Sequence, residues 1–218
     1  MAHRREFLAQ LGVAAAAIAF DADEMRAATR VATGSSWDTS WLDRLASAQY
    51  RVVFNASDIA DGAAMDYAAG FLDGYHEVHG TTDAQTRPVI VFRRMGTVMG
   101  LNDMLWDKYG VGADRKINDS ATHAPARRNV FWTAAPGASP ESASTKIETL
   151  HKRGMISLVC AIAAGNVARG FAEKTGRPVD EVREEVKANL VPGAILVPSG
   201  IYALIRAQNA GCAYMQGT

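Results

Sequence analysis

The chain has 218 residues, of which 48% are hydrophobic and 21% charged, a composition typical of a globular protein with a core rather than of a disordered chain. Its 23 basic and 23 acidic residues are interspersed and give a formal net charge of zero, which argues against a nucleic-acid-binding protein. Two cysteines, Cys160 and Cys212, are too few for a disulfide framework, although an exported protein could form one bridge between them.

The first thirty residues have the features of an export signal. Arg4 and Arg5 precede an alanine-rich apolar run at 8–20, whose 13 residues are too few to cross a bilayer, which takes roughly 20. Paired arginines before a weakly hydrophobic run resemble a twin-arginine signal, with possible cleavage at 17–19 or 26–28. The alternative is an amphipathic helix of a cytosolic protein. We expect residues 1–30 to be removed, and a mature protein in the periplasm without stable membrane insertion.

After an N-terminal extension at 31–49, short apolar runs alternate with helical patterns. The alternation predicts crossover connections, and therefore one α/β domain over residues 50–218 with a largely parallel sheet of about five strands and helices on both faces. In chain order, we expect a strand at 51–55, a helix at 59–78, a strand at 88–92, helices at 98–109 and 146–153, a strand at 155–160, helices at 162–174 and 178–190, a strand at 194–197, a helix at 201–210 and a strand at 212–215.

The interval 111–145 is predicted to be an irregular insertion, because it is rich in Ala, Pro, Ser and Asn and has Phe131 and Trp132 near its middle. Loops of this length in a compact domain are usually functional or disordered. Together with Trp106 and Tyr109, the two aromatic residues indicate that the segment packs onto its own domain or onto a neighbouring subunit.

Polar residues follow the predicted strands at their carboxyl ends. In a parallel sheet these ends meet at one edge, where ligands bind. Asn55, Arg93, Cys160, Ser199 and Gly200 would therefore line one pocket for a small molecule or anion, in which the arginine could bind a sulfur oxyanion or a carboxylate. Ser199 and Gly200 form a strand-to-helix junction that either only caps the helix or also receives an anion.

Cys160 is the candidate catalytic residue. A thiol at the start of a helix has its thiolate favoured, whereas a thiol buried among apolar residues such as Leu158 and Val159 is inert, and both interpretations stay open. Cys212 is a resolving thiol, half of a disulfide with Cys160, or a core residue. Asn166, on the helix after Cys160, completes the candidate ligand-binding residues.

The last sixty residues resemble the exported members of the DsrE/DsrF-like family, in Leu158-Val159-Cys160-Ala161, Leu190-Val191-Pro192-Gly193, Val197-Pro198-Ser199-Gly200-Ile201-Tyr202 and Gly211-Cys212-Ala213-Tyr214. The resemblance implies a flavodoxin-like domain, assembly into a homo-oligomer, and a sulfur-handling protein that accepts or passes sulfane sulfur on Cys160. If it is an enzyme, it is a sulfurtransferase or sulfur carrier whose partner is a sulfur donor. The alternative is a non-catalytic anion-binding or assembly module with structural cysteines.

The histidines do not form a recognisable metal motif. His76 and His79 are three residues apart near a predicted helix end, but no acidic or cysteine residue is spaced to complete a site, so a solvated helix end is the simpler interpretation. His123 and His151 are single and expected at the surface. Hydrolase, kinase and dinucleotide motifs are absent from the sequence, and we expect neither a metal nor a cofactor.

Overall fold

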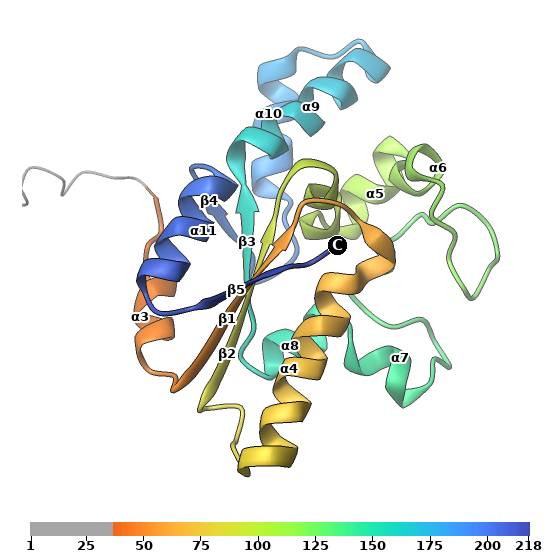
Figure 1. Ribbon diagram of the computed structural model, residues 1–218. Coiled ribbons are helices and arrows are strands. Elements are labelled where there is room, and N and C mark those ends of the chain that lie inside the picture. The colour runs from red at the N-terminus through yellow and green to blue at the C-terminus, as the bar shows by residue number, and fades with distance from the viewer. Residues whose placement is uncertain (1–36) are drawn as a thin grey trace, which may run out of the picture. The chain divides into compact units, whose positions relative to one another are not determined.

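The computed structural model describes residues 37–218, so the expected signal at 1–30 lies outside the described residues. The described part is an α/β domain built on a five-stranded parallel sheet with helices on both faces (Figure 1), which confirms the predicted fold class. Across residues 37–218, no helix combines the length and the apolar character that a membrane crossing would need.

The strands run parallel in the order β4-β3-β2-β1-β5. The first four strands therefore lie side by side in sequence, and β5 returns to the free side of β1. In flavodoxin itself β1 lies between β2 and β3, whereas here it lies between β2 and β5. Their bounds are Tyr50–Ala56 (β1), Thr86–Phe92 (β2), Ile156–Cys160 (β3), Ile195–Val197 (β4) and Ala213–Gln216 (β5).

The helices expected at 59–78 and 98–109 are each a 3-10 segment followed by an α-helix, and the interval 111–145, predicted to be irregular, contains the short helices α6 and α7. At Gly100 an added Cβ would lie 2.7 Å from Val159 Cγ2, so this glycine allows the 3-10 segment to approach β3. Asn102 then caps α5 by accepting a hydrogen bond of 3.2 Å from the amide of Leu105. The bounds are Trp41–Ala46 (α3), Ala60–Gly62 (η1), Ala63–His79 (α4), Arg94–Gly100 (η2), Asp103–Tyr109 (α5), Val111–Arg115 (α6), Pro140–Ser144 (α7), Ile147–Lys152 (α8), Ala161–Thr175 (α9), Val179–Ala188 (α10) and Gly200–Asn209 (α11).

Each face of the sheet has its own core, because successive strand residues point to opposite faces. Val53, Val91 and Leu158 pack against α3 and α11, whereas their neighbours Phe54 and Phe92 belong to the core under α4, α5, α8 and α9. All five of these side chains are buried. Strands buried on both faces are expected for a parallel sheet, and explain their near-continuous apolar sequences.

The domain begins earlier than predicted. Trp41 and Leu45, within the region expected to be an N-terminal extension, are fully buried on the α11 face of the sheet. Their spacing of four residues places both on one side of α3, which is the sequence signal that was missed. The boundary at residue 50 is therefore wrong, because α3 is part of the core.

The interval 111–145 packs against other parts of the same domain. Asn129 is fully buried, and its side-chain amide donates to the carbonyls of Met99 (2.8 Å) and Leu101 (2.7 Å). Phe131 is buried against Trp106 with ring centroids 6.1 Å apart. Of the two expectations for this segment, packing within the chain is therefore the one observed.

Candidate functional site

Two of the predicted strand-end residues, Arg93 and Cys160, lie on one edge and one face of the sheet. Phe92 of β2 is in register with Val159 of β3, so Arg93 and Cys160, which follow them, are neighbours on adjacent strands. Cys160 is also in register with Val197 at the end of β4. By the alternation of strand side chains, Arg93 and Cys160 point to the face covered by α11.

The chain leaves this edge in two directions. After β3 it enters α9, whose Ala164 and Ala168 belong to the core on the α4 face. After β4 it enters α11, whose Ala203 and Ala207 belong to the opposite core. Adjacent strands that continue to opposite faces create the crevice in which open α/β sheets bind ligands. Figure 1 shows α9 and α11 leaving the sheet after the adjacent strands β3 and β4. Cys160 and Ser199 are the N-caps of these two helices.

Cys160 ends β3 and is the N-cap of α9, a helix of 15 residues. Its Sγ accepts a hydrogen bond of 3.5 Å from the amide of Ala163, and the residue is 6% exposed. The predicted position at a helix N-terminus is therefore confirmed, and so is burial. An amide donor therefore lies at the sulfur atom, while burial restricts access to it.

Arg93 is half-buried beside the first residue of α11. A Cβ added to Gly200 would lie 3.0 Å from Arg93 Cδ, so the glycine makes room for the arginine. Within the described part of the chain, the guanidinium has neither a hydrogen bond nor an ion pair. The hydroxyl of Ser199 accepts a hydrogen bond of 3.0 Å from the amide of Tyr202 and so caps α11.

Two other predicted ligand-binding residues do not join this group. Asn55 is buried, but its side-chain nitrogen donates to Tyr214 Oη (3.0 Å) and to Gln216 Oε1 (3.0 Å), which fastens β1 to β5. Asn166 is exposed on α9, beyond the turn that Cys160 caps. The structure thus brings together Arg93, Cys160, Ser199 and Gly200, and leaves Asn55 and Asn166 outside the group.

Cys212 lies at the opposite edge of the sheet. It precedes β5, whose first residue Ala213 is in register with Val52, near the amino end of β1. Both cysteines are free thiols. Burial raises the pKa of Cys212 to about 11, although Arg51 opposes this. Because β2 and β1 separate β3 from β5, and both thiols are free, Cys160 and Cys212 of one chain do not form a bridge. A resolving role for Cys212 stays a prediction.

The histidines serve packing. His76 Nε2 lies 3.2 Å from Asp83 Oδ1, and the ring of His79 stacks on Tyr50 with centroids 5.7 Å apart. His151 is not at the surface as expected: it is half-buried and shares a hydrogen bond of 2.8 Å with the hydroxyl of Ser157. Within residues 37–218, no three His, Cys, Asp or Glu side chains are grouped closely enough to hold a metal ion.

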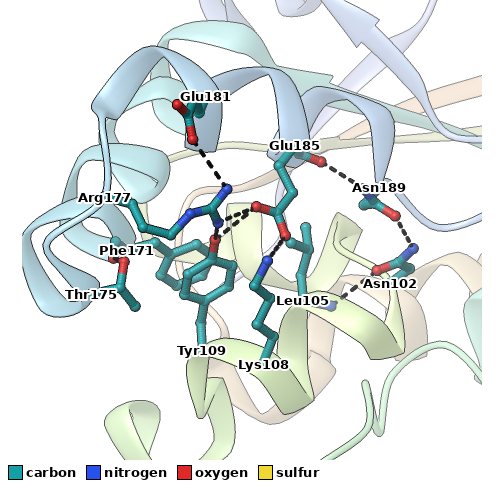
Figure 2. Close-up of polar contacts among 10 residues, drawn as sticks. All are labelled: Asn102, Leu105, Lys108, Tyr109, Phe171, Thr175, Arg177, Glu181, Glu185 and Asn189. Carbon is teal, nitrogen blue, oxygen red and sulfur yellow. Dashed lines mark hydrogen bonds and ion pairs between the residues drawn. The ribbon is translucent and has the colours of Figure 1, made fainter.

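A polar network that the sequence did not reveal joins α5 to α10 (Figure 2). The Glu185 carboxylate accepts hydrogen bonds from Lys108, from Tyr109 Oη (3.0 Å) and from Arg177 Nη1 (2.5 Å). Burial by itself raises the pKa of Glu185, but these three donors together outweigh it and lower the pKa to about 2. The Tyr109 ring stacks on Phe171 with centroids 4.0 Å apart. Because the carboxylate is fully partnered, we interpret the network as structural.

The cavities that the structure shows clearly lie elsewhere. One of about 580 Å³ separates α5 from residues 119–128, and its charged walls are paired as Arg127–Asp107 and Arg128–Asp119. Arg93 and Cys160 line none of these four cavities.

No known protein family matches the sequence, and no curated protein is significantly similar to it. Arguments about function therefore rest on the residues themselves.

Proposed function

We propose that the chain is an exported, periplasmic sulfur-handling protein of the DsrE-like type that accepts or passes sulfane sulfur on Cys160. The observation that supports it best is the position of Cys160: the thiol caps α9 at the carboxyl end of β3, one strand away from an arginine without a partner in the described part. Sulfur transfer needs a thiolate, and an amide donor and a guanidinium near the sulfur are groups that bind an anion.

The proposed transfer uses no cofactor. The Cys160 thiolate attacks the outer sulfur of a donor persulfide, a new S–S bond forms at Sγ, and the donor's S–S bond breaks. The donor leaves as a thiolate that carries the electron pair, so no net oxidant or reductant is consumed. The amide of Ala163 and the guanidinium of Arg93 would stabilise the negative charge of the resulting persulfide.

A second candidate is a non-catalytic module that binds a small anion at the same edge with an inert thiol. The low exposure of Cys160, 6%, favours it, because a shielded thiol reacts slowly. In this function Arg93 and the N-termini of α9 and α11 would hold the anion, and both cysteines would be structural.

Sulfur loading distinguishes the two functions. The reduced protein is incubated with polysulfide, and intact-mass spectrometry counts added sulfur atoms in the parent and in Cys160→Ser and Cys212→Ser. The sulfur-handling function predicts one added sulfur in the parent and in Cys212→Ser and none in Cys160→Ser. Equal loading of Cys160→Ser and the parent, or no loading of the folded parent, rejects transfer on Cys160 and leaves the anion-binding module.

We also propose that the protein is a homo-oligomer. Ile201 and Ile205 lie one turn apart on α11 and are 60% and 52% exposed, and edge strand β5 exposes Tyr214 and Met215. An uncharged edge strand beside exposed apolar residues favours self-association. Sedimentation velocity should show an oligomer that Ile205→Glu dissociates and that Ile162→Glu, at an exposed position on α9, leaves intact. A monomeric parent protein would refute this part of the proposal.

A further inference from the structure

A cavity of about 290 Å³ lies on the face of the sheet opposite to Cys160. It is enclosed by the turn that follows β1 and by side chains from the interval 111–145 and its continuation into α8. Its wall includes Phe131, which belongs to the core on the α4 face, whereas Cys160 points to the α11 face. The lining includes Asp61, Ile117, Arg128, Phe131, Ser142 and Lys146.

Lys146 gives this cavity a positive charge that nothing neutralises directly. Its side chain is half-buried, and in the part of the chain that the structure describes no carboxylate or carbonyl accepts a hydrogen bond from its ammonium group. Burial lowers the pKa of Lys146, as does the nearby Arg128 guanidinium, while Asp66 opposes them. A partly desolvated cation without a partner costs free energy, which an anionic ligand would recover.

Arg128 does not provide a second free charge. Its guanidinium donates to Asp119 Oδ2 (2.6 Å) and to the carbonyl of Thr133 (2.8 Å). Asp61 also lines the cavity and is exposed, so a second negative charge on a ligand would meet a carboxylate. One unpaired cation opposite one acidic residue suits a ligand with a single negative charge, and disfavours a dianion such as sulfate.

The rest of the wall is mixed: Asn118 and Ser120 add polar groups, and Ile117, Val130, Phe131 and Ala135 form its apolar part. A mixed wall suits a ligand with one charged end and one short apolar end, and the volume is close to the lower end of small-molecule sites, about 300 Å³. The turn after β1 holds Ala60 and Asp61 at φ of 39° and 51°, an unfavourable backbone conformation that is common beside binding sites.

We propose that this cavity binds a small organic acid with one carboxylate and a short apolar chain. The carboxylate pairs with the Lys146 ammonium group, the hydroxyl of Ser142 is available as a second donor, and the chain packs against Phe131 and Val130. The site is separate from the proposed sulfur chemistry and does not depend on it.

The test uses hexanoate as the probe, with hexan-1-ol as a matched chain without charge and sulfate as a charge without a chain. Isothermal titration calorimetry on the folded protein should show hexanoate binding at least roughly tenfold more tightly than either comparison compound. Lys146→Gln should weaken hexanoate binding by roughly tenfold or more. Lys152→Gln should have no effect, because Lys152 is paired with Glu148 (3.1 Å) on the same helix and does not line the cavity.

A second variant guards against a folding defect in Lys146→Gln. Ala135→Leu keeps Lys146 and fills part of the cavity, so it should also weaken hexanoate binding while circular dichroism shows a native fold. The proposal is overturned if hexanoate does not bind, if sulfate binds as tightly as hexanoate, or if folded Lys146→Gln and Ala135→Leu bind hexanoate like the parent protein.

Discussion

At the scale of single residues, the two thiols have nearly equal exposure and opposite surroundings. Cys160 is 6% exposed and receives an amide hydrogen bond at a helix N-terminus, whereas Cys212 is 7% exposed and burial raises its pKa to about 11. Because the thiolate is the reactive form, we expect iodoacetamide at neutral pH to label Cys160 faster than Cys212 in the reduced native protein. Peptide mass spectrometry over a time course measures both rates.

The control for this labelling is the denatured protein, in which both thiols should react at similar rates because neither environment persists. Cys160→Ser should fold, since the serine hydroxyl can accept the same amide hydrogen bond from Ala163. Labelling of Cys160 only after denaturation would contradict the prediction and weaken the case for sulfur transfer.

His151 should make stability depend on pH. Burial lowers its pKa from 6.5 to about 4, so the unfolded chain binds the proton more readily than the folded one. The stability that this neutral histidine contributes is complete above about pH 6.5 and is lost as the pH falls towards 4. Between neutral pH and about pH 4.5 the loss should be about 2 kcal/mol.

Urea unfolding of the parent protein and of His151→Gln at both pH values isolates this contribution from that of the carboxylates. The parent should lose about 2 kcal/mol more than His151→Gln on acidification. His123→Gln, at an exposed position, should behave like the parent. An equal loss in the parent and in His151→Gln would show that His151 is not responsible.

At the scale of elements, Glu185 connects α10 with α5 and with the turn that precedes α10. Its carboxylate binds Lys108 and Tyr109 of α5 and Arg177, which lies between α9 and α10 (Figure 2). Glu185→Gln should lower the free energy of unfolding at neutral pH by about 2–4 kcal/mol, because it leaves partly buried donors without a charged acceptor. Its lowered pKa means that this stabilisation is present above about pH 4.5 and is lost as the pH falls towards 2.

Glu184→Gln is the matched control on the same helix. Glu184 pairs with Lys187 at 2.7 Å, but its side chain is 72% exposed, and such pairs contribute at most about 1 kcal/mol. Denaturant unfolding of both variants tests the prediction. Equal effects of the two substitutions would mean that the network does not hold α5 against α10.

At the scale of the whole molecule, the proposed location depends on Arg4 and Arg5. Replacing both arginines by lysine should abolish export, because a twin-arginine signal depends on the guanidinium pair and not on positive charge alone. Fractionation of cells that express the double variant should find the protein only in the cytoplasm. Arg26→Lys, near one of the two candidate cleavage regions, is the control and should still be exported. Normal periplasmic accumulation of the double variant would refute the twin-arginine route.

The sequence by itself determined the order of elements and the edge at which Arg93, Cys160 and Ser199 gather. Apolar runs and helix-start residues are local signals, and the parallel sheet then follows from their alternation. The fold of the interval 111–145 could not be predicted in this way, because it comes from contacts such as that of Asn129 with Met99, which is distant in the chain.

Only the tertiary structure decided which of the strand-end residues are close together. Asn55 is fastened to β5, and Cys212 lies at the far edge from Cys160, because the chain crosses from β4 to the free side of β1 before β5 begins. The neighbours of Glu185 and Lys146 are also known only from the tertiary structure, because they come from several elements. Sequence patterns report which face of an element is buried, whereas the partners of a charge depend on strand order and on the path of the chain between elements.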